Sequence, residues 1–84
     1  LNMRLDKYLK VSRIIKRRTV ANEACDAGRV VVNGKIARAS YDVKVNDVIE
    51  LTLGARTVKA RVVSVNEDAK KDEAAMMYEI IEEK

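Results

Sequence analysis

Three consecutive cations, Lys16, Arg17 and Arg18, stand immediately before a stretch that has the pattern of a helix, residues 19–27. The first turn of a helix leaves backbone N–H groups unpaired and carries a partial positive charge, so it attracts anions. Cations at this position are therefore unfavourable unless a bound anion satisfies both them and the helix end. The run predicts a phosphate-binding site at the start of this helix.

Further cations lie on one side of a helix predicted near the N-terminal end. In "RLDKYLKVS", one face is formed by residues at helical spacing, which are Leu5, Tyr8, Leu9 and Ser12. Arg4, Lys7 and Lys10 fall roughly 150° from the centre of that face, at about 100° per residue. If the two helices pack together, we expect one surface, the basic patch, made of Arg4, Lys7, Lys10, Arg13, Lys16, Arg17 and Arg18.

The sequence offers little for catalysis or metal binding. It has no histidine, which excludes histidine-dependent triads, and its single cysteine, Cys25, excludes the paired cysteines of zinc sites. Cys25 falls on the apolar face of the second predicted helix, so we expect a buried small hydrophobe rather than a nucleophile. We therefore expect no catalytic residue, no metal site and no cofactor.

Length and composition predict one small folded domain over residues 1–84. The chain is 48% hydrophobic, which argues against disorder, and 84 residues leave no room for a second domain. No apolar stretch approaches the ~18–20 residues of a membrane span. A lone thiol suits a reducing compartment, so we expect a cytoplasmic protein without membrane contact.

The net charge of +4 is distributed unevenly along the chain. Residues 1–20 carry seven cations against Asp6 alone, a net of +6, whereas residues 66–84 carry seven acids against three lysines, a net of −4. A basic end on a small domain is typical of a protein that binds a polyanion, and a merely solvated charged face is the alternative.

The rest of the chain reads as a second helix followed by short strands. We expect the apolar face of that helix to comprise Val20, Ala21, Ala24, Cys25 and Ala27. Gly28 has the position of a helix-ending residue with positive φ, and Asn33-Gly34 is a strong hairpin signal. "DVIELTL" and "TVKARVVSV" alternate as strands, with a turn at Asn46-Asp47 before them and a loss of alternation near Val63.

The C-terminal segment is ambiguous. In "KKDEAAMMYEIIEEK", Ala74, Met77 and Ile81 have helical spacing, which favours a helix that places the Met77–Ile81 cluster in the core. "MMYEII" also fits a strand after a short helix, so whether residues 78–81 are helix or strand stays open. We expect the acidic residues of this segment to remain in water or to keep RNA on the opposite face.

This order of elements predicts an α+β fold, with an N-terminal helix pair followed by a small, mostly antiparallel sheet. No long recognition helix suits the major groove of DNA. A compact basic face that contacts the backbone favours folded RNA as the ligand.

Ordered motifs give the chain a specific resemblance. "RLDKYL", "KRRTVANEACDAGRVVVNGK" and "VKVNDVIEL" resemble the S4 RNA-binding domain, whose usual signature is R-L-D-x-x-L, S-R-x-x-A, G-x-V-x-V-N-G and a later G-D-x-I. The match covers residues 4–65 and leaves a C-terminal extension, residues 66–84. Arg17 replaces the usual Ser of the S-R pair and Asn46 the usual Gly before Asp47. The resemblance implies the S4-like (alpha-L) fold, with Arg4 and Arg18 as RNA contacts and Asp6 in a structural role.

The chain is also similar to a narrower group, the RqcP-type small S4 proteins of bacterial ribosome-associated quality control, which are related to the short heat-shock S4 proteins. This similarity implies a non-enzymatic, monomeric adaptor. The expected partners are 23S ribosomal RNA of the large subunit, peptidyl-tRNA and an RqcH-type factor, in support of C-terminal tailing of stalled chains.

Three alternatives remain at this point. One is a heat-shock-type S4 protein that recycles aborted large subunits without a tailing role. Another is a fragment of an RNA-modifying enzyme, since S4 domains often precede catalytic domains. The third is a protein-interaction module that acts through the acidic C-terminal segment.

Overall fold

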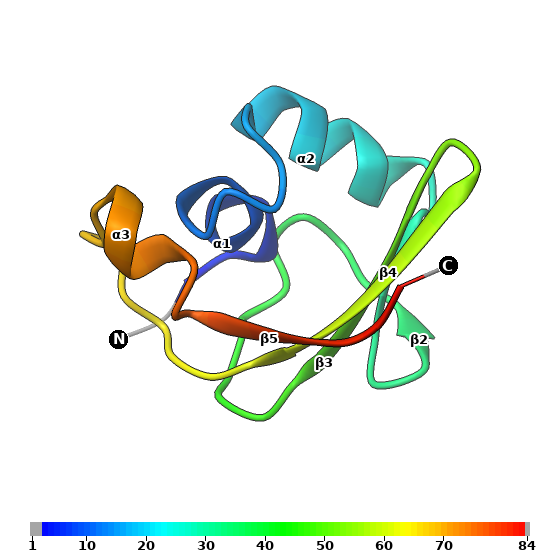
Figure 1. Cartoon of the computed structure of the whole chain (residues 1–84). Helices are drawn as coiled ribbons and strands as arrows, with labels where there is room; N and C mark the ends of the chain where they lie inside the picture. The colour runs from blue at the N-terminus through cyan, green and yellow to red at the C-terminus, as the bar shows by residue number, and fades with distance from the viewer. Residues whose placement is uncertain (1–2, 84) are drawn as a thin grey trace.

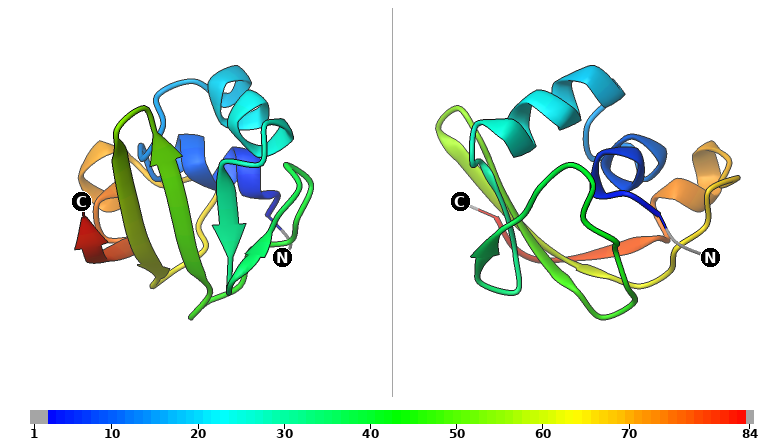
Figure 2. Two further views of the ribbon diagram at one scale, coloured as in Figure 1. Left: turned by 90° about the vertical axis from the view of Figure 1, so that its right-hand side faces the viewer. Right: turned by 180° about the vertical axis from the view of Figure 1, so that it is seen from behind.

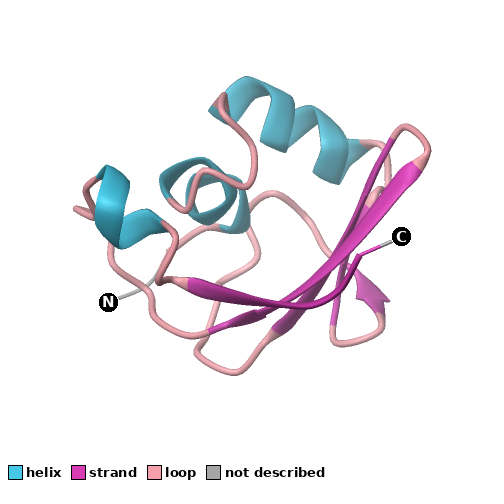
Figure 3. Cartoon of the chain, in the orientation of Figure 1, coloured by secondary structure: helices cyan, strands magenta, loops and turns pink. Residues whose placement is uncertain are grey.

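A computed structural model describes residues 3–83 of the chain (Figure 1). Its elements follow in the order α1 Leu5–Val11, α2 Arg18–Asp26, β1 Val30–Val32, β2 Lys35–Ile36, β3 Val48–Leu53, β4 Arg56–Val62, α3 Lys71–Ala74 and β5 Tyr78–Glu83. Colouring by secondary structure separates the N-terminal helices from the strands that follow them (Figure 3). The predicted α+β class, with a helix pair before an antiparallel sheet, is confirmed.

Helix α1 has the predicted buried face. Leu5, Tyr8, Leu9 and Ser12 are all buried, and the Tyr8 hydroxyl donates a hydrogen bond of 2.7 Å to the carbonyl oxygen of Met77. The first backbone N–H groups of α1 are satisfied by a neighbouring segment, because Leu5 N donates to Tyr41 O and Asp6 N to Ala39 O. Residues 39–41 are thereby fixed beside the start of the helix.

Helix α2 begins at Arg18, one residue before the predicted start, after the extended residue Arg17, and its buried face is narrower than expected. Ala21, Ala24 and Cys25 are buried, whereas Val20 is 42% exposed and Ala27 is exposed, so the prediction for these two residues is wrong. Val20 and Ala27 lie roughly 100° or more from the centre of the buried face, where α1 no longer covers the helix.

Gly28 ends α2 as predicted. It has a φ of +73°, and its N–H donates to Cys25 O while the next N–H, from Arg29, donates to Ala24 O. These two bonds form a Schellman motif, which satisfies the last carbonyl groups of the helix. The chain then turns directly into β1.

The sheet has five strands in the order β2-β1-β3-β4-β5, and each neighbouring pair is antiparallel. The predicted hairpin turn joins β1 to β2, with positive φ at both Asn33 and Gly34. Asn46 has a φ of +78°, which explains why a glycine is usual at this position in the family signature. The strand predicted to lose its alternation near Val63 ends at Val62.

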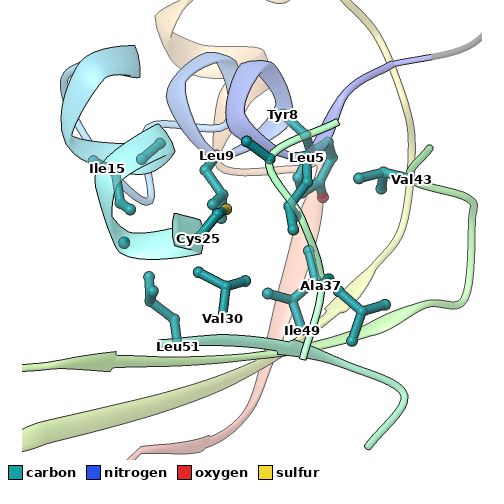
Figure 4. Close-up of a cluster of buried hydrophobic side chains, with 14 of the residues drawn as sticks. Leu5, Tyr8, Leu9, Ile15, Cys25, Val30, Ala37, Val43, Ile49 and Leu51 are labelled. Atoms are coloured by element: carbon teal, nitrogen blue, oxygen red, sulfur yellow. The ribbon is translucent and has the colours of Figure 1, made fainter. Parts of the chain in front are cut away.

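The hydrophobic core lies between the two N-terminal helices and one face of the sheet (Figure 2). In the close-up, Leu5, Leu9 and Cys25 point from the helices toward Val30 and Leu51 on the strands (Figure 4). Among the described residues, Tyr8 is the one aromatic side chain in the buried core, in agreement with the absence of Phe and Trp.

A buried carboxylate fixes the long connection between β2 and β3. Asp47 is 7% exposed and accepts hydrogen bonds from Asn33 Nδ2, from the Tyr41 hydroxyl and from the backbone N–H of Lys44. Burial alone would raise its pKa, but these donors outweigh burial and hold the pKa of Asp47 below its ordinary value. The connection is therefore tied at its C-terminal end to the β1–β2 turn.

The C-terminal segment contradicts the favoured helix. Residues 71–74 form a single helical turn, and residues 78–83 form β5, which pairs with β4. Met77 is buried as predicted, but Ile81 is 52% exposed, so the predicted core cluster does not extend to that residue. The edge of β4 has backbone N–H and C=O groups that are free to pair with another strand. A strand can pair with these groups whereas a helix cannot, which explains why residues 78–83 form β5.

Within residues 3–83, no helix is long and apolar enough to span a membrane. The same residues contain no group of three or more histidine, cysteine, aspartate or glutamate side chains placed to hold a metal ion.

Candidate nucleic-acid interface

The candidate interface is organised around Asp6, the second residue of α1. Its side chain is only 3% exposed, yet it carries a carboxylate. The backbone N–H of Lys7 donates to its Oδ1 atom at 2.8 Å, and the start of the helix favours a negative charge. The resemblance implied a structural role for Asp6, and its contacts agree with that role.

Two arginines of the basic patch converge on this carboxylate. Arg4 donates from Nε to Oδ1 of Asp6 at 3.2 Å and from Nη2 to Oδ2 at 3.3 Å. Arg18, at the start of α2, places its Nε atom 3.4 Å from the same Oδ2. Asn22 of α2 adds a hydrogen bond of 3.2 Å from Nδ2. One carboxylate therefore connects the starts of both helices.

The charge of Asp6 is maintained by its donors. Burial by itself would raise its pKa, but the hydrogen bonds from Asn22, Arg4, Arg18 and the Lys7 N–H outweigh burial, and the pKa of Asp6 lies below its ordinary value. The carboxylate is thus ionised at neutral pH. Since two guanidinium groups share one carboxylate, the cluster keeps a net positive charge.

Both arginines remain open to a ligand. The side chains of Arg4 and Arg18 are 51% and 48% exposed, so each is held on one side and accessible on the other. A guanidinium group has five N–H donors, of which Asp6 occupies at most two in each arginine. We call Arg4, Asp6 and Arg18 the arginine clamp.

A second group of predicted residues lies at the opposite end of α1. Lys10, Arg13 and Lys16 line one hollow of about 560 Å³. Arg13 follows the end of α1 with a φ of +65°, and its N–H donates to Lys10 O at 3.0 Å. Because α1 has seven residues, this group lies about 10 Å from the arginine clamp along the helix axis.

Acidic residues border this second group. Glu67 and Asp68 line the same hollow, and Glu67 forms an ion pair of 3.0 Å with Lys7. Glu67 and Asp68 precede the segment "KKDEAAMMYEIIEEK", whose acids were expected to remain in water or to keep RNA on the opposite face, so these two residues do not bear on that prediction. Both residues belong to the chain between β4 and α3 (Figure 1).

The structure thus divides the predicted patch. It brings Arg4 and Arg18 together through Asp6, and Lys10, Arg13 and Lys16 together around one hollow. Lys7 is engaged by Glu67. Arg17 is exposed at the start of α2, and its side chain has no partner within residues 3–83.

Sequence reasoning missed Arg38 and Lys35. Arg38 lines a hollow of about 470 Å³ together with Arg4, and both Lys35 and Arg38 line an adjacent hollow of about 570 Å³. They reach this place because residues 39–41 bond to the start of α1. Residues 37–42 have no periodic pattern, so no local signal in the sequence indicates that contact.

Comparisons with known proteins show which family the chain belongs to. The family model described as S4 domain matches residues 3–49. A protein of Streptococcus pneumoniae named RQC P-site tRNA stabilizing factor is 57% identical over 81 residues, which cover 96% of this chain and 92% of that protein. A protein of Bacillus subtilis with the same name is 51% identical, over 96% of this chain and 94% of the relative.

A solved structure shares the fold. The trimeric structure of Vibrio cholerae Heat Shock Protein 15 superposes with a TM-score of 0.87 at 27% identity, over 95% of this chain and 82% of that one. The matched residues 3–49 contain the arginine clamp and the hollow shared by Arg4 and Arg38. The chain belongs to the S4 domain family and, within it, groups with the proteins named RQC P-site tRNA stabilizing factor.

Proposed function

We propose that this protein is a non-catalytic RNA-binding adaptor of bacterial ribosome-associated quality control. In this proposal it binds 23S ribosomal RNA of the large subunit together with peptidyl-tRNA, acts as a cytoplasmic monomer beside an RqcH-type factor, and supports C-terminal tailing of stalled chains. Support comes from the family membership, from the name of the relatives at 57% and 51% identity, and from the charge of the clamp.

The arginine clamp is the observation that carries the proposal. A free arginine must lose side-chain conformational entropy when it binds a phosphate. Asp6 restrains Arg4 and Arg18 before binding and still leaves about half of each side chain exposed. Arginine binds phosphate in a bidentate manner, so two restrained guanidinium groups suit a fixed arrangement of backbone phosphates.

The second group of cations extends this surface. Lys10, Arg13 and Lys16 supply further positive charge about one helix length from the clamp. Phosphate contacts of this kind position a protein on folded RNA without reading its sequence. A structured RNA surface of the large subunit, with a tRNA beside it, offers phosphates on both sides of such a small domain.

The test is co-sedimentation with purified large ribosomal subunits that carry peptidyl-tRNA. Arg18→Gln removes one clamp charge and should lower the association constant about 10- to 100-fold, since a charge-assisted hydrogen bond contributes ~1.5–3 kcal/mol. Arg56→Gln is the matched control, because Arg56 pairs with Glu83 on the sheet and lies outside the basic patch. Glutamine is preferred to glutamate at position 18, where a second carboxylate would face Asp6.

Each result has a clear meaning. Loss of co-sedimentation in Arg18→Gln, with wild-type binding in Arg56→Gln and similar melting temperatures for both variants, supports the proposal. If Arg18→Gln sediments with large subunits as well as the wild type does, the arginine clamp is not the interface and the proposal fails.

A second candidate is a heat-shock-type S4 protein that binds and recycles aborted large subunits without a tailing role. The structural match to Heat Shock Protein 15 favours it, although the identity of 27% is far below the 57% of the other relative. A reconstituted tailing reaction with an RqcH-type factor distinguishes the two. Dependence of tailing on this protein supports the adaptor, whereas tailing that proceeds equally without it supports recycling.

A further inference from the structure

The hollow of about 470 Å³ beside the arginine clamp is not explained by phosphate binding alone. It lies between the C-terminal half of α2, the end of β2 and the segment of residues 37–40. The hydrogen bonds from Leu5 and Asp6 to residues 41 and 39 hold that segment against the start of α1. Figure 2 shows α2 and the chain after β2 on the same side of the molecule as this helix start.

The lining of the hollow combines positive charge with an apolar wall. Arg4 and Arg38 lie among its lining residues, and Arg38 is exposed with no side-chain partner within residues 3–83. Ile36 forms part of the wall and is 71% exposed, although it is a large aliphatic residue. A flat aromatic ligand that covers Ile36 would remove this apolar surface from water.

Acceptor groups complete the lining. Asp26, at the end of α2, is exposed and its carboxylate has no hydrogen-bond partner within the described part of the chain. Asn22 donates from Nδ2 to Asp6, which leaves its Oδ1 atom as an acceptor for a ligand. A ligand in this hollow therefore meets both arginine donors and carboxylate and amide acceptors.

We propose that the hollow takes one unstacked nucleotide of the bound RNA, with its phosphate between Arg4 and Arg38 and its base against Ile36 and Asp26. This proposal rests on the proposed RNA-binding function and adds a base preference to it. Two carboxylate oxygens match the two neighbouring N–H donors of guanine, its N1–H and its amino group. Uracil instead places two carbonyl oxygens beside its single N–H donor, and these would repel Asp26.

Fluorescence anisotropy with short labelled RNAs tests this inference on the full chain. The probes are single-stranded oligouridines with one central position that is guanosine, inosine or uridine. Inosine lacks only the amino group of guanosine. We expect the wild type to bind the guanosine RNA about tenfold more tightly than the uridine RNA, with inosine between them.

Variants separate the base pocket from the rest of the interface. Asp26→Asn should bring the guanosine-to-uridine ratio close to one, while Glu23→Gln, an equal charge change on an exposed residue of the same helix, should leave the ratio unchanged. Arg38→Ala should weaken binding of all three RNAs by a similar factor. Neither Asp26 nor Arg38 has a side-chain partner within residues 3–83, so these variants should fold.

The outcomes also distinguish this inference from the proposed function. Equal affinity of the wild type for the three RNAs, or a ratio that survives Asp26→Asn, overturns the nucleotide pocket even if large subunits still bind through Arg18. A guanosine-to-uridine affinity ratio that falls to about one in Asp26→Asn, but not in Glu23→Gln, supports the nucleotide pocket. If Arg18→Gln does not weaken large-subunit binding, the proposed interface is wrong. The base preference is then decided by the oligonucleotide affinities alone.

Discussion

The side chain of Asp6 is charged although it is buried, with only 3% of it exposed. An unpaired buried carboxylate would be strongly destabilising, but Asp6 accepts bonds from Asn22, Arg4 and the Lys7 N–H and contacts Arg18. The same contacts restrain the arginines that we assign to RNA binding. At this scale, stability and function depend on one residue, and its substitution should change both.

The pH dependence of stability tests the role of Asp6. Its pKa is lower in the folded chain than the ordinary value of 3.8, so the unfolded chain binds more protons as the pH falls. The stabilisation by Asp6 is therefore complete above about pH 5 and is lost as the pH falls through the folded pKa. Asp6→Asn should lower the free energy of unfolding at pH 7 by about 1–3 kcal/mol.

Thermal melts of the two proteins check this prediction. The difference in melting temperature between wild type and Asp6→Asn should be largest near neutral pH and should narrow in acid. Asp47 also has a lowered pKa, so both proteins should lose stability in acid, the wild type more steeply. A Glu23→Gln control should melt like the wild type at pH 7. A constant difference across the pH range would contradict the assignment.

At the scale of elements, the turn between α1 and α2 determines the position of the second group of cations, Lys10, Arg13 and Lys16. Arg13 occupies the left-handed region with a φ of +65°, where a residue with a Cβ atom costs roughly 1 kcal/mol relative to glycine. Glycine is the usual residue after a helix end, yet this chain has arginine. The conformation directs the chain from the end of α1 toward Lys16 and the hollow shared with Glu67.

Paired variants at position 13 separate backbone strain from charge. Arg13→Gly and Arg13→Ala both remove the cation, so both should weaken RNA binding to the same extent. Only glycine relieves the left-handed strain, so Arg13→Gly should be more stable than Arg13→Ala by about 1 kcal/mol in urea denaturation. Equal stabilities would show that the turn relaxes when the side chain is shortened, and wild-type RNA affinity would exclude Arg13 from the interface.

Local patterns predicted most of the fold, and long-range contacts account for the errors. The spacing of Leu5, Tyr8 and Leu9 and the Asn33-Gly34 turn depend on neighbouring residues, and both predictions are confirmed. The local pattern of residues 78–81 fitted either a helix or a strand, and pairing with the free edge of β4 determines that they form a strand. The arginine clamp was predicted in part. Arg4 and Arg18 were predicted as RNA contacts, but the packing of α1 against α2 was needed to show that they share the carboxylate of Asp6.

At the scale of the whole molecule, the two charged ends of the chain are not kept apart. The acids of the C-terminal extension pair with cations on α1 and on the sheet, through Lys7–Glu67, Arg61–Glu79 and Arg56–Glu83. The clamp, Arg17 and the hollow of Lys10, Arg13 and Lys16 remain as the parts of the basic patch that are available to bind phosphate. Composition predicted a polyanion ligand, whereas only the tertiary structure identifies which cations are already paired.

The most direct test is the salt dependence of binding to large ribosomal subunits. Six phosphate contacts, from Arg4, Lys10, Arg13, Lys16, Arg17 and Arg18, predict that the logarithm of the association constant falls by about 5 per tenfold increase in salt, at ~0.7–0.9 per contact. Arg18→Gln should reduce that slope by about 0.7–0.9, while Arg56→Gln should leave it unchanged. An unchanged slope in Arg18→Gln, with binding intact, would contradict a phosphate-binding clamp at Asp6.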